Sequence, residues 1–383
     1  MHILWINNKA SLGGGAEQYI YNTVTHLNKK GITSSLLYDP NIEVSHDFLD
    51  IFKMSFPLVL PTEQIKSIQP DLIYIHQLND IDTFEDIINS NVKTIRFYHD
   101  HKLFCLREHK YTTLTKRTCT QKTGFNCYTC LGFINKTQNG FKLSSLGKLE
   151  KLQKLNSRLD TFLVASNYMK EHLKLHDFDA KKIFINPLYA NENNHYKKDV
   201  NFTKSKTLLF VGQLLMGKGI DILLNAMKDI DSSYKLKIIG AGAQNELFKA
   251  YSKKLKLQDR VEFVGAVKHE DLVKHYQEAY CLIVPSRTPE TFNLTGVEAL
   301  KAGLPVIAAD VGGIKEWLRD GINGLLFDSN DHKDLSRKVN HLIATPSMHY
   351  NFCFNAFKSM VYDFKSKTHI DNLISTFNQT IQG

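Results

Sequence analysis

Two glutamates stand at the junction of an apolar run and a helix-like segment within residues 283–303. Glu290 lies in the polar loop after the apolar run, and Glu298 follows after seven intervening residues, on a segment that Asn293 is suited to cap. A strand that leads into a helix N-terminus offers backbone N–H groups and a positive dipole end to an anion such as phosphate. From spacing alone, an ordinary βα turn with two solvated acids is the alternative to an anion site.

Glycine turns and one lysine follow two further apolar runs in the second half of the chain. Gly212 follows the strand-like run 207–211, Lys218 stands between two glycines just before a helix-like segment, and Gly240 and Gly242 end the next run. The backbone of such a turn can approach a phosphate closely, and the lysine would add a cation. The alternative for a lone lysine on a loop of this kind is simple exposure to solvent.

The first half of the chain opens with the same arrangement. An apolar run at 2–6 precedes Gly13, Gly14 and Gly15, and a helix-like segment follows them. Glycine also occurs in turns that bind nothing, because it tolerates positive φ. His99 follows another apolar run, at the carboxyl end of a predicted strand, where ligands bind in open parallel sheets. The alternative for this residue is a loop histidine that is hydrogen-bonded to backbone.

These stretches together carry a family resemblance. The run IVPSRTPETFNLTGVEALKAG resembles the E-x7-E signature of the retaining family-4 glycosyltransferases, and FVGQLLMGKGID resembles the opening of that family's second domain. The similarity continues through residues 310–316 and 320–327. It covers nearly the whole chain, is strongest over 207–328 and is weakest near the cysteines. It implies the GT-B architecture, an α/β fold of two Rossmann-like domains that face each other across a cleft.

The resemblance implies an enzyme that moves a sugar from a nucleotide-diphosphate sugar to an acceptor with retention of configuration. In that family the departing phosphate helps to deprotonate the acceptor. Catalytic roles are then expected for Glu290, which would stabilise positive charge on the sugar, for His99 at the transferred sugar, and for Lys218 at the diphosphate. Glu298 would accept hydrogen bonds from the ribose. Gln213 stands where the family has arginine, which leaves more of the phosphate charge to Lys218.

Further donor-binding residues are expected at the glycine turns, at the family's base-binding edge and at the helix start. They are Gly14, Gly15, Gly212, Gln213, Gly240, Gly242, Val267, Phe292, Asn293, Leu294 and Thr295. No cofactor is expected for catalysis, because none of the three Asp-x-Asp triplets follows a strand-like run as a metal–diphosphate site would require.

The chain is long enough for two domains. We expect an N-terminal acceptor domain at 1–190 with a cysteine-bearing insertion at 102–141, and a C-terminal donor domain at 205–364. The resemblance implies that the C-terminal helix, 365–383, packs back on the first domain. Leucines at helical spacing over 141–159 predict an amphipathic helix, which either packs on its own domain or lies in a membrane interface.

Four of the six cysteines fall in the insertion, with the spacing C-x13-C-x7-C-x2-C. Four thiols with one C-x2-C pair are typical of a tetrahedral zinc site, whereas reduced loop thiols are the alternative. The residues of this tentative structural zinc site are Cys105, Cys119, Cys127 and Cys130.

The net charge of +9 suits a surface that faces anionic lipid or a phosphate-bearing substrate. Nucleic acid is not expected as a partner, since the sequence carries no recognisable binding motif. The N-terminus reads as a strand rather than a signal peptide, and no apolar run is long enough to span a membrane. These features predict a cytoplasmic protein, with a peripheral contact at the inner face of the cell membrane as an option.

By its kind, a protein with this resemblance uses a UDP-sugar, or alternatively a GDP-sugar. Its acceptor is expected to be a glycan or lipid-linked glycan of a bacterial surface polysaccharide, such as lipopolysaccharide, capsule or exopolysaccharide. A nucleotide-sugar epimerase and a non-catalytic nucleotide-sugar-binding subunit are the alternative functions.

Overall fold

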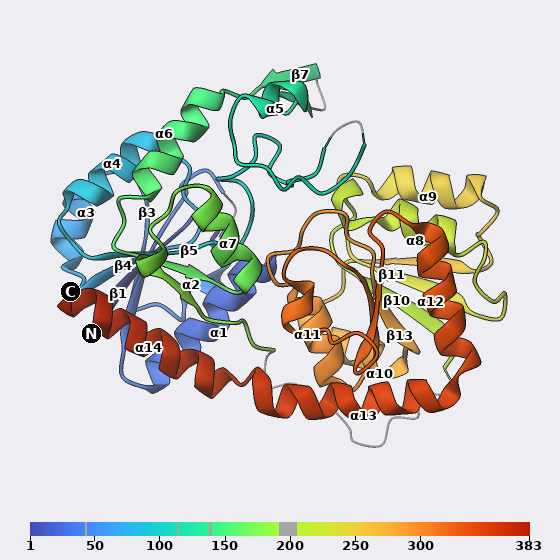
Figure 1. Cartoon of the computed structure of the whole chain (residues 1–383). Coiled ribbons are helices and arrows are strands. Elements are labelled where there is room, and N and C mark those ends of the chain that lie inside the picture. The colour runs from blue at the N-terminus through green and yellow to red at the C-terminus, as the bar shows by residue number, and fades with distance from the viewer. Residues whose placement is uncertain (43, 113–114, 138–139, 191–204) are drawn as a thin grey trace. The chain divides into compact units, whose positions relative to one another are not determined.

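A computed structural model describes residues 1–42, 44–112, 115–137, 140–190 and 205–383 of the chain. The chain forms two compact units, each built around its own parallel β-sheet with flanking helices (Figure 1). The first unit comprises Met1–Glu108, Gln121–Leu188 and Lys367–Gly383, and the second comprises His109–Thr120 and Tyr189–Ser366. The prediction of an α/β fold with two Rossmann-like units is confirmed.

The first unit has a seven-stranded sheet in the order β3-β2-β1-β4-β5-β8-β9, in which every neighbouring pair is parallel. The central strands are buried on both faces and are therefore continuously apolar rather than alternating. The strands are β1 (His2–Asn7), β2 (Thr33–Tyr38), β3 (Met54–Pro57), β4 (Leu72–Ile75), β5 (Thr94–Phe97), β8 (Thr161–Val164) and β9 (Ile183–Ile185). The helices are α1 (Gly15–Lys29), α2 (His46–Leu49), α3 (Pro61–Ile68), α4 (Ile81–Asn89), α5 (Asn126–Thr129), α6 (Leu146–Asn156), α7 (Asn167–Leu175), η1 (Ala180–Lys182) and α14 (Ser366–Gln382).

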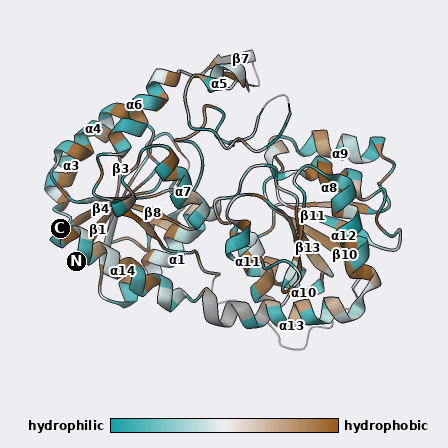
Figure 2. Ribbon diagram, in the orientation of Figure 1, coloured by the Kyte–Doolittle hydropathy of each residue, from teal (hydrophilic) through white to brown (hydrophobic). Residues whose placement is uncertain are grey.

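The second unit has a six-stranded parallel sheet in the order β12-β11-β10-β13-β14-β15. Figure 2 shows hydrophobic strands in both sheets, with helices whose residues are partly hydrophilic. The strands are β10 (Thr207–Val211), β11 (Lys235–Ile239), β12 (Val261–Gly265), β13 (Cys281–Val284), β14 (Val306–Ala309) and β15 (Gly324–Phe327). The helices are η3 (Met216–Lys218), α8 (Ile220–Ala226), α9 (Asn245–Lys254), α10 (His269–Glu278), α11 (Leu294–Lys301), η4 (Gly312–Glu316), α12 (His332–Ala344) and α13 (Pro346–Asp363).

The amphipathic helix predicted over 141–159 is shorter than expected. Residues Gly140–Leu143 form β7 instead, which pairs antiparallel with β6 (Ile134–Thr137). The helix begins only after Ser145, whose hydroxyl accepts a hydrogen bond from the Lys148 N–H at 3.2 Å. The leucines of α6 are buried within the first unit, so this stripe is a packing face. Leu143, by contrast, is 72% exposed.

The C-terminal helix α14 belongs to the first unit. Leu373 and Phe377 are fully buried, and the Phe377 ring lies 5.3 Å from the Tyr74 ring of β4. The Thr380 hydroxyl is 2.8 Å from that of Thr161 at the start of β8. Residues 191–204, between the two expected domains, fall outside the described residues. Segment 109–120, expected in the first domain, packs in the second unit instead.

Candidate functional site

The carboxyl edge of the second sheet brings together the glycine turns that follow β10 and β11 and the loop that follows β13. Parallel neighbouring strands end at the same edge, so their following loops converge there. Gly219 has φ +72°, and a Cβ atom at this position would overlap the carbonyl oxygen of Pro285. A Cβ on Gly240 would overlap the backbone of Gly212. Glycine is therefore required for the backbones to approach this closely.

Lys218 and Glu290 form an ion pair within this edge. The Lys218 Nζ atom lies 2.8 Å from Glu290 Oε1 and 3.1 Å from Oε2, and the Ser286 hydroxyl also donates to the carboxylate. Glu290 is only 8% exposed. Burial opposes its ionisation, but Lys218 and hydrogen bonds from Ser286 and Asn293 outweigh that effect and hold the pKa of Glu290 below its ordinary value. The pair is thus a buried carboxylate anion beside a half-buried cation.

The second glutamate, Glu298, lies on α11 and has different partners. Its Oε1 atom is 2.8 Å from His269 Nε2, and its Oε2 accepts a hydrogen bond from the Tyr276 hydroxyl at 3.0 Å. The hydrogen bond to Glu298 raises the pKa of His269, against the opposing effect of burial. His269 and Tyr276 lie on α10, so sequence spacing gave no signal for either contact.

The start of α11 is shaped by Asn293, which adopts φ +73° and accepts a hydrogen bond from the Gly296 N–H at 2.9 Å. Phe292 is buried, and its carbonyl oxygen accepts a hydrogen bond from the Trp317 indole. Leu294 and Thr295 form the first turn of the helix. The Asn293 side chain also hydrogen-bonds to Glu290, so the N-terminus of α11 lies next to the Glu290 loop.

An arginine that sequence analysis did not select holds the Lys218 turn in place. Arg287 binds both carboxylate oxygens of Asp221 at 2.9 Å and also donates to the carbonyl oxygen of Met216, the first residue of η3. Its Nε atom donates to Asn330 Oδ1 at 2.9 Å. Arg287 is 2% exposed and already bound to a carboxylate, so it supports the site without replacing the cation missing at Gln213.

Segment 109–120 of the insertion contacts this network. The Thr118 hydroxyl donates to the carbonyl oxygen of Arg287 at 3.3 Å, and Asn330 Nδ2 donates to the carbonyl oxygen of Lys116 at 2.9 Å. A Cβ on Gly217 would lie 3.4 Å from the ring of buried Tyr111. Part of the insertion therefore packs directly on the turn that carries Lys218.

The remaining donor-side predictions fall around the same edge. Gln213 is exposed in the turn after β10, and Gly242 follows β11, where a Cβ would lie 2.6 Å from the carbonyl oxygen of Leu214. Val267 is half-buried two residues beyond β12, the strand next to β11. The structure thus gathers the predicted residues of the second unit at one end of one sheet.

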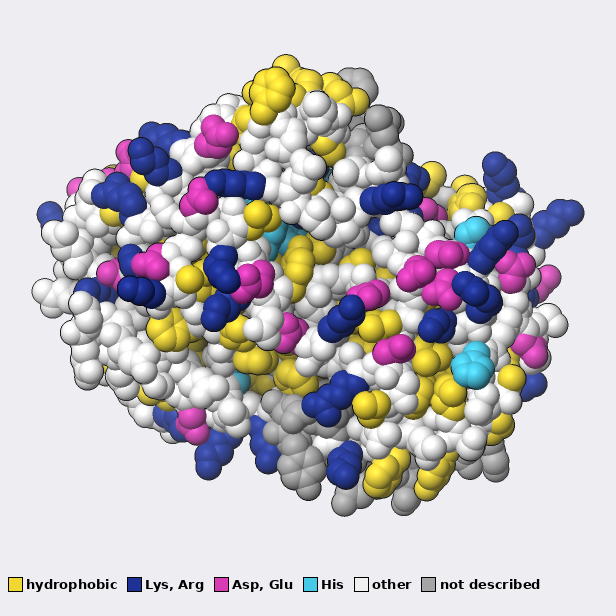
Figure 3. Space-filling model, viewed as in Figure 1, with side chains coloured by type: hydrophobic (Ala, Val, Ile, Leu, Met, Phe, Trp, Pro, Cys, Tyr) yellow, Lys and Arg dark blue, Asp and Glu magenta, His cyan; other side chains and the backbone are white. Residues whose placement is uncertain are grey.

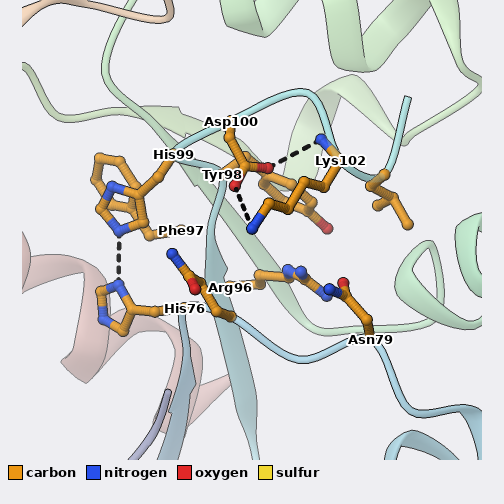
Figure 4. Close-up of a pocket in the computed structure, with 10 residues that line it drawn as sticks. His76, Asn79, Arg96, Phe97, Tyr98, His99, Asp100 and Lys102 are labelled. Atoms are coloured by element: carbon orange, nitrogen blue, oxygen red, sulfur yellow. Dashed lines mark hydrogen bonds and ion pairs between the residues drawn. The ribbon is translucent and has the colours of Figure 1, made fainter. Parts of the chain in front are cut away.

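In the first unit, His99 lies at the carboxyl end of the sheet. It follows β5 by two residues, and its Nε2 atom is 2.7 Å from Nδ1 of His76, which follows β4 (Figure 4). Burial, with a smaller effect of the Arg96 cation, lowers the pKa of His99 to about 3. His99 is therefore a neutral imidazole at ordinary pH, suited to hydrogen bonding rather than to acting as a general base.

A small pocket surrounds this histidine, lined by residues of β5 and of the loops after β4 and β5, most of them polar (Figure 4). Lys102 Nζ lies 3.9 Å from Asp100 in its wall.

The predicted glycine turn also belongs to this unit. Gly14 has extended backbone before α1, its carbonyl oxygen accepts a hydrogen bond from Gln18, and Gly15 is the first residue of the helix.

The cysteines do not form the predicted tetrahedral group in this structure. Among the described residues, no three His, Cys, Asp or Glu side chains are arranged to hold a metal ion. Cys119 lies in the second unit, whereas Cys105, Cys127 and Cys130 lie in the first. The structural zinc therefore stays a prediction, which metal analysis of the purified protein would decide.

Part of the chain is similar in sequence to known glycosyltransferases. Residues 191–359 match the family Glycosyl transferases group 1. An uncharacterized glycosyltransferase of Methanocaldococcus jannaschii is 34% identical over 184 residues, which is 48% of this chain and 50% of that protein. An uncharacterized 41.2 kDa protein in the cps region of Klebsiella pneumoniae is 31% identical over 192 residues, 50% of this chain and 48% of that protein. The alignments thus span about half the length of these curated relatives.

Among solved structures, HepE of Anabaena in complex with UDP-glucose has the same fold. It superposes with a TM-score of 0.74 over 99% of this chain and 100% of that one, at 17% sequence identity. The sequence of residues 191–359 thus matches the family Glycosyl transferases group 1, and the fold of the whole chain matches that of HepE.

Proposed function

We propose that this protein is a retaining glycosyltransferase that uses a nucleotide-diphosphate sugar. The observation that carries the proposal is the Lys218–Glu290 ion pair, set among glycine turns beside the N-terminus of α11. An ammonium group has three donors. Two contacts go to Glu290, and a donor diphosphate oxygen would take the third, so Lys218 would stabilise the leaving-group charge.

The two carboxylates have separate roles in this proposal. Glu290 stays ionised at neutral pH and would stabilise the positive charge that develops on the sugar ring as its bond to phosphate breaks. The acceptor oxygen then bonds to the same carbon, and its proton passes to the departing phosphate. Glu298, oriented by His269 and Tyr276, would accept hydrogen bonds from the ribose with its remaining lone pairs.

A UDP-sugar is the donor that we propose first, with a GDP-sugar as the alternative. HepE, which shares the fold, was crystallised with UDP-glucose. A glycan or lipid-linked glycan of a surface polysaccharide is proposed as the acceptor, and the relative in the Klebsiella cps region supports this class. We place the enzyme in the cytoplasm at the inner face of the membrane. No helix in the described part of the chain is long and apolar enough to cross a bilayer.

An exposed apolar patch supports the membrane contact. Phe125 and Leu143 are 81% and 72% exposed, and Tyr128 and Leu131 are 42% and 41% exposed. The Phe125 and Tyr128 rings lie 5.7 Å apart. Figure 3 shows hydrophobic side chains gathered at the top of the view. Sedimentation with anionic vesicles would test this patch. Phe125→Ser should lower the bound fraction, since an apolar side chain gains about 1.5–3 kcal/mol on full burial. Phe354→Ser, which alters a 63% exposed phenylalanine of the second unit, should not change it.

The donor assignment is tested by screening nucleotide-sugars for thermal stabilisation of the protein and then for sugar transfer. Transfer that depends on an acceptor supports the proposal. Isomerisation of the donor alone would identify an epimerase, and binding without turnover would identify a non-catalytic subunit. The stereochemistry of the product, read by NMR, decides between retention and inversion.

A further inference from the structure

His76 lies among aromatic side chains in the first unit and is only 3% exposed. Its ring stacks on Trp5, with centroids 5.2 Å apart and planes 4° from parallel, and lies 4.4 Å from the Tyr74 ring. The His99 ring lies 5.0 Å away on the neighbouring strand's end. Figure 4 shows the two imidazoles joined through one nitrogen of each. Sequence analysis selected His99 alone, because the spacing of His76 and His99 carries no signal of this contact.

The contact of 2.7 Å between His76 Nδ1 and His99 Nε2 requires one proton between two nitrogens. Burial lowers the pKa of both rings, so neither is positively charged at neutral pH. Two arrangements remain. Either His76 Nδ1–H donates to His99 Nε2, or His99 Nε2–H donates to His76 Nδ1.

The surroundings of the other His76 nitrogen distinguish these arrangements. Its Nε2 atom is buried and has no hydrogen-bond partner among the described residues. If His76 accepted the shared proton, a buried N–H at Nε2 would be left without an acceptor. If His76 donates, Nε2 is only a bare lone pair, and buried acceptors without partners are better tolerated than buried donors without them. The parallel stacking on Trp5 keeps the in-plane N–H away from the Trp5 ring face.

We propose that His76 is a positioning residue that fixes His99 as the neutral tautomer with its proton on Nδ1. Tyr19 of α1, whose ring lies 5.4 Å from His99, and Phe97, stacked at 4.3 Å, restrict the ring further. A neutral imidazole whose tautomer is set by a second residue presents a donor of defined direction. The next step rests on the proposed function. The Nδ1–H of His99 would donate a hydrogen bond to an oxygen of the transferred sugar. His99 would neither accept a hydrogen bond from a substrate hydroxyl nor take that hydroxyl's proton.

The tautomer is measured directly by long-range ¹⁵N–¹H NMR on the full-length protein labelled at histidine, with His99 assigned by comparison with His99→Asn. The expected result is a pyrrole-type, protonated Nδ1 and a pyridine-type Nε2 at His99 in the wild-type chain. A protonated Nε2 on His99 overturns the proposal. This measurement needs no activity, so it stands apart from the proposed function, which fails separately if no nucleotide-sugar supports transfer.

Two variants of His76 separate positioning from mere packing. The side-chain amide of His76→Asn can place an N–H where Nδ1 stands, whereas His76→Gln places its amide where Nε2 stands. We expect His76→Gln to lower kcat by about 10–100-fold, the loss seen when a residue that orients a metal-bound histidine is removed, with little change in donor KM. His76→Asn should keep the Nδ1–H form of His99 in the NMR spectrum and recover most of kcat.

An equal loss of kcat in His76→Gln and His76→Asn would overturn the proposal and assign His76 a purely structural role. His2→Gln is the matched control. Its ring nitrogen contacts Ser35 Oγ at 2.8 Å in the same unit, but at the start of β1 and so at the opposite edge of the sheet. That variant should leave both kcat and the His99 spectrum unchanged.

Discussion

At the scale of single residues, Lys218 and Glu290 form a pair whose members differ in their access to water. The Lys218 side chain is 30% exposed and that of Glu290 is 9% exposed. The lysine can therefore turn toward an incoming anion, whereas the carboxylate is held by Ser286 and by the pair itself. Removing the cation would leave a buried charge without its strongest partner, with consequences for both activity and stability.

Lys218→Ala should lower kcat/KM for the donor by about 30- to 1000-fold, equivalent to about 2–4 kcal/mol of lost transition-state stabilisation. The physical reason is the loss of a preorganised cation at the leaving phosphate. This change in kcat/KM is measured by steady-state kinetics with the donor found in the screen. Lys315→Ala is the control, because Lys315 pairs with Asp310 at 2.8 Å in the same unit but is 62% exposed. Near-normal kinetics in Lys218→Ala would show that the phosphate binds elsewhere.

The same pair predicts a pH dependence of stability. The pKa of Glu290 is lowered in the folded protein, so its ionised form stabilises the fold above the ordinary pKa of 4.5, and this contribution disappears as the pH falls below that value. Lys218→Met removes the cation that lowers this pKa. Urea unfolding should therefore show the variant less stable than the wild type at neutral pH, with the difference shrinking below about pH 4.5. A difference that grew on acidification would contradict the assignment.

At the scale of elements, tight backbone packing positions the site more than side-chain length does. Gly219 and Gly321 both have φ +72°, but only Gly219 faces another backbone, whereas a Cβ on Gly321 would meet open space. Gly321→Ala should lower the free energy of unfolding by about 1–2 kcal/mol, because a residue with a Cβ atom disfavours the left-handed conformation. Gly219→Ala should lower the free energy of unfolding more than Gly321→Ala does. It should also weaken donor binding, because the Lys218 turn must move away from Pro285. Denaturant unfolding of the two variants makes the comparison, and equal costs would refute it.

Segment 109–120 is a second positioning element, since it reaches the Lys218 turn through Asn330 and Arg287. Asn330 has φ +66°, so Asn330→Gly tests its side chain without adding backbone strain. Losing these hydrogen bonds, worth about 1 kcal/mol each in net terms, should raise the donor KM about fivefold while kcat changes little. An unchanged KM would show that Arg287 holds η3 through Asp221 and Met216 without help from the segment.

At the scale of the whole molecule, the two units have separate cores, and the C-terminal helix α14 contributes to the first one. Leu373→Ala should lower the stability of the first unit by about 2–5 kcal/mol, the usual cost of truncating a buried leucine. The second unit should keep its stability and its stabilisation by the nucleotide. Unfolding followed by a probe in each unit would show this, and a loss confined to the second unit would contradict it.

Much of the fold was predictable because its signals are local. Buried parallel strands are continuous apolar runs, and the glycine turns that follow them mark where a strand ends and the next helix approaches. The predicted strand at 207–211 matches β10 at both ends. The prediction over 141–159 was wrong at its start, because the periodicity of the leucines continued past the serine cap that begins α6.

The alternation of strands and helices, the placing of Lys218 and the glycines in turns, and the spacing of Glu290 and Glu298 could all be read from the chain. Each depends on residues that are close in the chain. The side-chain contacts became visible only in the folded chain: His76 with His99, Arg287 with Asp221, and Glu298 with His269 and Tyr276. These contacts depend on strand order and on the packing of helices between sheet and solvent, which bring together residues that no local periodicity connects.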